Sequence, residues 1–318
     1  MALDEATRAL CERMAAQRWK PLHEMTVAEA RALPKDLAAA AEPPSLPPVS
    51  RAEDHHVPTP GGGFAVRVLV PRGAVRGVLV YYHGGGWVIG ELEQYEVLGR
   101  LLARETGCAV VVAEYRLAPE HPYPAAPDDA WSALVWAAER AESLAGAGAP
   151  LVVAGDSAGG NLAAVVAQRA RDEGGPELAA QVLVYPATDA DLDRPSYREP
   201  ENQLLVSRDS MVWFWNHYLP DPARRTDPAA APLRAATLAG LPPAIVLTAG
   251  HDPLRDEGEE YARRLEAAGV PVRAKRFADQ MHGFFTLAGV LPGSAEGIGF
   301  VARQLDPLLR PKSAKETS

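Results

Sequence analysis

The spacing of hydrophobic positions changes near residue 50 of this chain. Before that point, apolar residues recur at helical spacing, which predicts an amphipathic helix over residues 3–19. The positions on this stripe are Leu3, Ala6, Leu10 and Met14. Thr26 and Glu29 have the spacing of a capping box, which predicts a second short helix. The run AEPPSLPPVS that follows is too rich in proline for regular structure, so we expect residues 1–50 to form a separate helical preface.

After the preface, short apolar runs alternate with amphipathic stretches. Residues 64–70 alternate as a half-buried strand does, whereas residues 77–82 and 108–115 are short apolar runs, as in buried parallel strands. The predicted strands cover residues 64–70, 77–82, 108–115, 150–155, 180–186, 242–250 and 270–277. The predicted helices cover residues 128–144, 158–172 and 255–268. Strands that alternate with helices predict an α/β fold with a mostly parallel sheet and helices on both faces.

Residues 187–240 interrupt this alternation. They contain the aromatic run MVWFWNHYL, several Asp-Pro and Ala-Pro pairs and no clear strand. Because the segment lies between two predicted strands, we interpret it as an insertion over the sheet. The predicted core therefore covers residues 51–186 and 241–310, and a polar tail covers residues 311–318.

Composition and charge narrow the class of protein. The chain has 318 residues, of which 47% are hydrophobic, and a net charge of −9. An acidic chain lacks the basic surface that nucleic-acid binding needs, and two cysteines, Cys11 and Cys108, are too few for a disulfide framework or a zinc site. The N-terminus is charged, unlike a signal peptide, and no run approaches the roughly 18 apolar residues of a membrane span. We therefore predict a cytoplasmic protein without a stable membrane anchor. The pair His55–His56 has no third ligand at a suitable spacing, so we interpret it as surface and expect no metal.

The segment VVAGDSAGGNLAA carries the most specific chemical signal. Residues 155–159 match G-x-S-x-G between a predicted strand and a predicted helix, the setting of a nucleophile elbow. The turn is strained and leaves no room for bulky neighbours, and the helix that starts at once directs its amides and its dipole at the serine oxygen. Ser157 is therefore the predicted nucleophile. The alternative is a glycine-rich turn capped by serine.

A nucleophilic serine needs a histidine to take its proton and a carboxylate to orient that histidine. After a nucleophile elbow, the acid and then the histidine follow in chain order. His282 follows the last predicted strand, where the base is expected. The alternatives are His251 and His217, but His217 lies inside the aromatic insertion and His251 is interpreted as a structural neighbour of the acid.

Three aspartates compete for the position of the acid. Asp252 comes directly after the strand at 244–249, and the carboxyl ends of parallel strands are where α/β sheets build their sites. Asp256 lies in the first turn of the next predicted helix, where an acidic residue suits the helix dipole. Asp279 lies only three residues before His282 on the same loop. We therefore predict Asp252 as the acid.

The run VLVYYHGGGWVIGE places three glycines directly after a predicted strand. When a serine attacks an ester, the carbonyl oxygen becomes an anion that backbone amides within about 3 Å can stabilise. Glycines leave such amides open, and the amide of Ala158 would complete the set. Trp87, which follows the glycines, is either a wall of the pocket or an ordinary core residue.

These motifs together resemble the bacterial hormone-sensitive-lipase-type family of α/β-hydrolase carboxylesterases over about residues 76–285. The matching motifs are HGGGW (83–87), EYRLAPEHPYPAAPDD (114–129), GDSAGGNLA (155–163), DPLRDEG (252–258) and HGF (282–284). The resemblance implies a catalytic triad of Ser157, Asp252 and His282, and an oxyanion hole made by the amides of Gly85, Gly86 and Ala158. It also implies a helical cap made from residues 1–45 and 187–240.

We accordingly expect a carboxylesterase that hydrolyses short- to medium-chain acyl esters without any cofactor. Its expected partner is a small-molecule ester, and a homodimer is left open. The residues expected to contact the substrate are Trp87, Trp213, Phe214 and Phe284. The alternatives are an amidase or peptidase with the same triad, a membrane-active lipase, and a non-catalytic receptor on the same scaffold.

Overall fold

The structure is a computed structural model that describes residues 2–17, 19–39 and 45–310, with the backbone alone for residues 34–39. The predicted polar tail at 311–318 lies outside the described residues.

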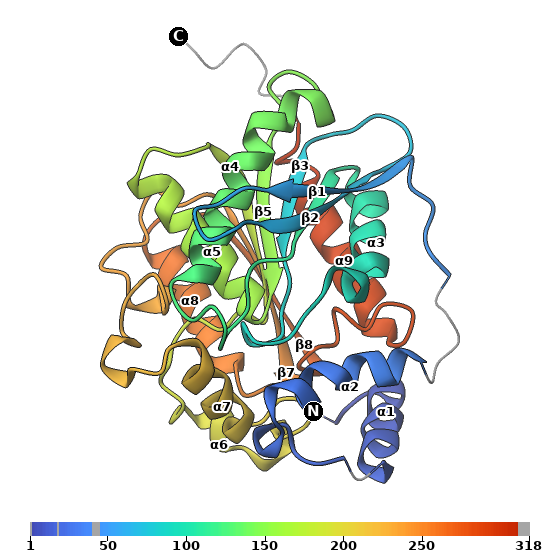
Figure 1. Cartoon of the computed structure of the whole chain (residues 1–318), viewed down its shortest axis with the longest axis vertical. Coiled ribbons are helices and arrows are strands. Elements are labelled where there is room, and N and C mark those ends of the chain that lie inside the picture. The colour runs from blue at the N-terminus through green and yellow to red at the C-terminus, as the bar shows by residue number, and fades with distance from the viewer. Residues whose placement is uncertain (1, 18, 40–44, 311–318) are drawn as a thin grey trace.

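An eight-stranded sheet forms the centre of the molecule (Figure 1), in the order β1-β2-β4-β3-β5-β6-β7-β8. The strands are β1 Arg51–Val57, β2 Phe64–Val70, β3 Val78–Tyr82, β4 Ala109–Ala113, β5 Leu151–Asp156, β6 Leu178–Val184, β7 Ala244–His251 and β8 Val272–Met281. β2 is antiparallel to both β1 and β4, and the other neighbours pair in parallel. The mostly parallel α/β sheet is therefore confirmed, and β1 is a strand that the apolar pattern does not predict.

Helices cover both faces of the sheet (Figure 1). One face carries α4 Ala125–Ala145, α5 Ala158–Asp172 and α8 Arg255–Ala267, and the other carries α3 Glu96–Thr106 and α9 Pro292–Leu305. Alternate residues of a strand face opposite sides, so Tyr82 packs in the core beneath α4 and α5 whereas Tyr81 packs in the core beneath α3 and α9. This alternation decides which side chains of β3 and β5 can meet.

The remaining helices gather beyond the carboxyl ends of the parallel strands, at the lower end of Figure 1. They are α1 Glu5–Ala16, η1 Leu22–Glu24, α2 Val27–Ala39, α6 Pro195–Arg198, η3 Pro200–Asn202 and α7 Arg208–Tyr218. Of the other short helices, η2 Leu92–Tyr95 lies before α3, η4 Pro222–Arg224 follows α7, and η5 Pro232–Arg234 contacts α5 and α8. We call α1, η1 and α2 together with residues 187–240 the outer segments. The predicted capping box is present, since Glu29 N donates to Thr26 Oγ1 at 3.2 Å and Thr26 N donates to Glu29 Oε2 at 2.6 Å.

Candidate active site

Ser157 occupies a strained turn between β5 and α5. Its backbone has φ 54° and ψ −117°, a conformation that costs energy for any residue with a side chain. The turn closes because its neighbours are glycines: a Cβ on Gly155 would lie 2.2 Å from Gly159 O, and a Cβ on Gly159 would lie 1.9 Å from Tyr82 O. Because Gly159 contacts Tyr82, the first turn of α5 packs directly against the end of β3, just before the run of three glycines.

His282 and Asp252 reach the serine from the ends of two neighbouring strands. β7 and β8 pair through His251 and Met281, so the residues that follow each strand come side by side. His282 Nε2 lies 3.1 Å from Ser157 Oγ, and His282 Nδ1 lies 2.8 Å from Asp252 Oδ2. Three residues that are far apart in the sequence thus form one hydrogen-bonded chain, as the motifs predict.

The tautomer of His282 follows from its partners. An ionised carboxylate only accepts hydrogen bonds, so Nδ1 carries the proton that Asp252 accepts. Nε2 then presents a lone pair to the Ser157 hydroxyl, which is the protonation state that a general base needs. Asp252 is held in turn by the amide of Leu254, which donates to its Oδ1 at 2.8 Å. All three side chains are buried, which strengthens each of these interactions.

The rival residues have other partners. Asp256 Oδ2 accepts from the amide of Ser196 at 2.8 Å, which ties α8 to α6. The carbonyl of Asp279 accepts from the amide of Asp4 ahead of α1 at 3.0 Å. His217 stays in α7, where its Nδ1 lies 2.8 Å from Trp213 O. None of these three side chains has a hydrogen bond to His282 or Ser157 among those of the described residues.

The glycine loop is tied to the elbow by hydrogen bonds. Gly84 N donates to Asp156 Oδ1 at 2.9 Å, and the amides of Val88 and Ile89 both donate to Gly85 O, at 3.1 Å and 2.9 Å. Gly85 and Gly86 have positive φ values of 101° and 59°. The structure therefore folds this loop tightly beside Ser157, where its amides were expected to serve the oxyanion.

The four aromatic residues expected at the substrate lie in different surroundings. Trp87 has no exposed surface and stacks on Tyr218, with ring centroids 4.2 Å apart, which favours its interpretation as a core residue. Phe284 is also fully enclosed. Its neighbours are Tyr185, Phe277 and Phe285. The expectation that Phe284 lines the pocket therefore has no support in its packing.

Trp213 and Phe214 come from α7 and contact each other edge to face. A Cβ on Gly86 would lie 2.1 Å from the Phe214 ring, so this ring abuts the glycine loop. Trp213 is half-buried beside His217, with ring centroids 4.2 Å apart. Contact of these two residues with a substrate stays a prediction.

Two buried ionisable groups beside the triad were missed in the sequence. Burial raises the pKa of Asp156 to about 6, against the opposing effects of the Tyr81 hydrogen bond and the charge of His282. Burial also lowers the pKa of His83 to about 4, so this histidine is neutral, and its Nδ1–H donates to Gly84 O at 2.7 Å. Residues with shifted pKa values gather at functional sites. Asp156 is part of the motif GDSAG and His83 is part of HGGG, so both were visible in the sequence.

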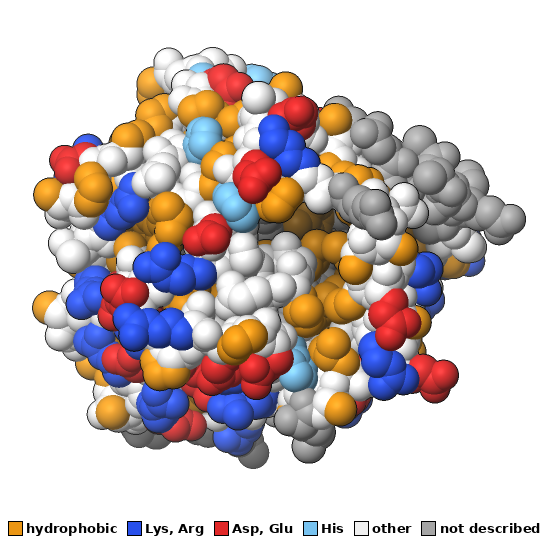
Figure 2. Space-filling model, turned by 90° about the horizontal axis from the view of Figure 1, so that it is seen from below, with side chains coloured by type: hydrophobic (Ala, Val, Ile, Leu, Met, Phe, Trp, Pro, Cys, Tyr) orange, Lys and Arg blue, Asp and Glu red, His pale blue; other side chains and the backbone are white. Residues whose placement is uncertain are grey.

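A cavity of about 340 Å³ opens between the outer segments. It is lined by Cys11, Met14, Ala15, Trp19, Lys20, Leu22, Met25, Leu33, Gln203, Leu204 and Leu205. Two of these residues touch the neighbours of His282, because Cys11 Sγ lies 3.5 Å from Met281 Sδ and a Cβ on Gly283 would lie 2.8 Å from Leu205. Figure 2 shows this end of the molecule hollowed, with hydrophobic side chains around the hollow.

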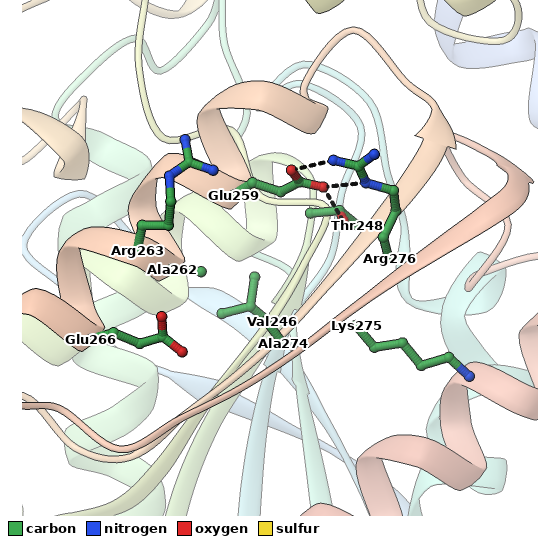
Figure 3. A pocket seen from close by; sticks show the side chains of 9 residues that line it. All are labelled: Val246, Thr248, Glu259, Ala262, Arg263, Glu266, Ala274, Lys275 and Arg276. Carbon is green, nitrogen blue, oxygen red and sulfur yellow. Dashed lines mark hydrogen bonds and ion pairs between the residues drawn. The ribbon is translucent and has the colours of Figure 1, made fainter.

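A second cavity, of about 210 Å³, lies between α8 and the strands β7 and β8 (Figure 3). Two of its charged side chains are paired with each other, since Arg276 Nε donates to Glu259 Oε1 at 2.6 Å, and Thr248 Oγ1 donates to the same oxygen at 3.2 Å. None of the triad residues is among the lining residues of either cavity, and the first cavity alone touches the neighbours of His282. Among the described residues, no cluster of three His, Cys, Asp or Glu side chains is suited to a metal ion, and no helix is long and apolar enough to cross a bilayer.

The fold and the Ser157–His282–Asp252 arrangement define a serine hydrolase on a mostly parallel α/β sheet. Residues 79–286 match the family described as having the alpha/beta hydrolase fold. The chain belongs to this family, and within it to the hormone-sensitive-lipase-type carboxylesterases.

The most informative relatives are esterases. Carboxylesterase NlhH of Mycobacterium tuberculosis is 46% identical over 264 residues, which cover 81% of this chain and 82% of the relative. Ethyl acetate hydrolase of Pseudomonas putida is 39% identical over 71% of this chain and 72% of its own length. A thermostable esterase from Pseudomonas putida ECU1011 superposes with a TM-score of 0.90 at 34% identity, covering 98% of this chain and 99% of that structure. This chain is therefore a carboxylic ester hydrolase, and ester hydrolysis takes precedence over the amidase and receptor alternatives.

Proposed function

We propose that the chain hydrolyses short- to medium-chain acyl esters by two-step acyl transfer, with Ser157 as nucleophile, His282 as general base and acid, and Asp252 as the residue that orients His282. The observation that carries the proposal is the continuous hydrogen-bonded chain from Asp252 Oδ2 through the imidazole to Ser157 Oγ. Serine alone is a weak nucleophile, and this arrangement removes its proton as it attacks.

In the first step, Ser157 Oγ forms a bond to the ester carbonyl carbon while its proton moves to His282 Nε2. The carbonyl oxygen takes up the negative charge, which the amides of Gly85, Gly86 and Ala158 stabilise. The carbon–alkoxy bond then breaks, and the proton on Nε2 passes to the departing alcohol. Ser157 is left as an acyl ester.

In the second step, water attacks the acyl ester and gives a proton to His282 Nε2. The bond between the acyl carbon and Ser157 Oγ breaks, and the proton returns to the serine. Asp252 stays ionised throughout and stabilises the imidazolium that forms twice in each cycle.

The cavity between the outer segments supports a limit on acyl length. Its walls are mainly apolar, and it adjoins the residues on either side of His282. A volume of about 340 Å³ is near the lower end of the usual range for ligand pockets, which favours short or medium acyl chains over long ones. A cytoplasmic location remains part of this proposal and fits the free thiols of Cys11 and Cys108.

The test is a series of p-nitrophenyl esters of increasing acyl length, assayed on the wild type and on Ser157→Ala as the blank. We expect kcat/KM to peak at short or medium chains and to fall at long ones. A maximum at long acyl chains would contradict the substrate class, and turnover by Ser157→Ala equal to the wild type would contradict the nucleophile.

A further inference from the structure

The carboxylate of Asp156 joins the two halves of the candidate active site. Asp156 is the last residue of β5 and directly precedes Ser157. Its Oδ1 accepts two hydrogen bonds, from the hydroxyl of Tyr81 at 2.8 Å and from the amide of Gly84 at 2.9 Å. The side chain is only 4% exposed, so these are buried, charge-assisted bonds when the carboxylate is ionised.

The carboxylate also packs directly against the glycine loop. A Cβ on Gly84 would lie 2.3 Å from Asp156 Oδ2, so only glycine allows the carboxylate this close. Gly84 immediately precedes Gly85 and Gly86, whose amides are the proposed oxyanion donors. The side chain of Asp156 thus connects the residue before the nucleophile to the loop that carries these donors.

Other bonds fix the peptide that leads into the loop. The hydroxyl of Tyr115 donates to His83 O at 2.8 Å, and His83 Nδ1 donates to Gly84 O at 2.7 Å. These bonds hold carbonyl groups, whereas Asp156 is the side chain that receives the Gly84 amide. Asp156 therefore controls the orientation of the amide that directly precedes the proposed donors.

We propose that Asp156 is a positioning residue, whose carboxylate, held by Tyr81, fixes the Gly84 amide and so directs the amides of Gly85 and Gly86 at the oxyanion of the acyl-transfer intermediate. This inference rests on the proposed acyl transfer at Ser157. A preorganised set of donors stabilises the transition state because no reorganisation is needed as the charge develops, and a loop that turns away by a small angle loses that advantage.

Burial of this carboxylate disfavours its ionised form, which raises its pKa to about 6. Asp156 therefore destabilises the fold at neutral pH, as functional groups often do. Burial and then the negative charge of Asp156 raise the pKa of the nearby Tyr81, Tyr95, Tyr115 and Tyr185, so these hydroxyls stay neutral. The charge that acts on Asp156 itself is that of His282. The imidazolium of His282 favours its ionised form, so the carboxylate also favours the charged state that His282 enters during the reaction.

The chain offers a matched pair of tyrosines for the test. Tyr81 and Tyr82 are neighbours in β3, and both side chains are buried with one hydroxyl bond each. Tyr82 points to the opposite face and donates to Ala130 O in α4 at 2.8 Å. Tyr81→Phe and Tyr82→Phe therefore remove the same group at the same depth, but only the first one releases Asp156.

The experiment measures kcat and KM for p-nitrophenyl butyrate, and the affinity for an alkyl trifluoromethyl ketone, in the wild type, Asp156→Asn, Tyr81→Phe and Tyr82→Phe. The ketone accepts Ser157 Oγ at its carbonyl carbon, the serine proton moves to His282, and the resulting oxyanion occupies the proposed hole. Asp156→Asn keeps an oxygen that can accept both bonds but loses the charge that strengthens them, so we expect kcat to fall about 10-fold with KM nearly unchanged, and ketone binding to weaken by a similar factor. Tyr81→Phe should show the same pattern to a smaller extent, and Tyr82→Phe should match the wild type.

Two results would overturn the inference: a folded Asp156→Asn with wild-type kcat and ketone affinity, or a loss confined to KM. If Asp156→Asn does not fold, the tyrosine pair decides, and equal kcat values for Tyr81→Phe and Tyr82→Phe refute the role. Absence of ester hydrolysis in the wild type would instead refute the proposed function, so the two failures are distinguishable.

Discussion

The loops at the strand ends and the outer segments are held in place by different interactions. Around Ser157 the chain is fixed by backbone contacts too close for a side chain, as at Gly155 and Gly159, and by buried hydrogen bonds to single atoms. The outer segments also contain ion pairs between side chains. Asp189, for example, is fully buried between Arg194 and Arg234, which lie 2.7 Å away.

Because of this difference, we expect the loops to determine the reaction rate and the outer segments to determine which esters are accepted. The loops hold the reacting atoms in nearly fixed positions, because a shift of the loops by a few tenths of an ångström would cause a clash with main-chain atoms. The outer segments surround an apolar cavity whose size depends on which side chains line it. Substitutions in the loops should therefore change the rate for every ester, whereas substitutions in the outer segments should change which esters are accepted.

The largest effect is expected from two histidines, one in each region. His282→Ala removes the general base and should lower kcat by up to ~10⁶-fold, as loss of a triad histidine does elsewhere. His217→Ala removes a histidine that packs on Trp213 in α7 and should leave kcat within a few-fold of the wild type. Initial rates on p-nitrophenyl acetate measure both. Comparable losses of kcat in the two variants would contradict the claim that only the loops hold the reacting groups.

Two aspartates near the start of α8 give the next largest contrast. Asp252→Asn keeps the size of the side chain but no longer fixes the tautomer of His282, so kcat should fall about 10⁴-fold. Asp256→Asn weakens a tie between α8 and the amide of Ser196 and should leave kcat nearly unchanged. The measurement is kcat at saturating ester, with circular dichroism to check folding. If Asp256→Asn lost as much activity as Asp252→Asn, the choice of acid would be wrong.

The strands and the triad could be predicted because their determinants are local. The apolar runs at 77–82, 108–115, 150–155, 180–186 and 242–250 became β3 to β7, since a strand buried on both faces is hydrophobic along its whole length. β1 was not predicted, because six of its seven residues are exposed and it forms the antiparallel edge of the sheet. α3 was also not predicted, although Leu98 and Leu102 lie four apart on its buried face and Gly107 ends it. That signal was present in the sequence.

The parts of the site that were not predicted depend on contacts between distant segments. Asp156 and Gly84 are 72 residues apart, and the local sequence around either residue does not indicate that they form a hydrogen bond. Tyr81 reaches Asp156 only because both side chains point to the same face of the sheet, a consequence of strand register. The cavity beside His282 brings α1, η1 and residues 203–205 together, and apolar periodicity within each segment does not fix that meeting.

The buried carboxylate of Asp156 should also make the free energy of unfolding depend on pH. Asp156 has a pKa of about 6 in the folded chain and an ordinary value of 3.8, so the folded state binds the extra proton between these two values. The free energy of unfolding therefore falls as pH rises from below 3.8 to above 6, by ~3 kcal/mol from this group.

Urea unfolding of the wild type and Asp156→Asn across this pH range measures that contribution. The variant lacks the titrating group, so its free energy of unfolding should fall by ~3 kcal/mol less than that of the wild type. Tyr82→Phe leaves the carboxylate in place and should follow the pH dependence of the wild type. Parallel curves for wild type and Asp156→Asn would show that Asp156 is ionised without any cost in the folded chain.

The smallest expected effect lies in the outer segments and concerns selectivity alone. Leu205 lines the cavity next to Gly283 and is 39% exposed, so a larger side chain can be accommodated there without disturbing the core. Leu205→Trp should reduce cavity volume and lower kcat/KM for p-nitrophenyl octanoate about 10-fold, while the acetate is hydrolysed at the wild-type rate. Leu46→Trp, at a position that is 50% exposed and outside the cavity lining, is the matched control and should change neither rate. An equal loss on acetate and octanoate would mean that the outer segments act on the reacting atoms themselves, because only a change in the loops slows every ester alike.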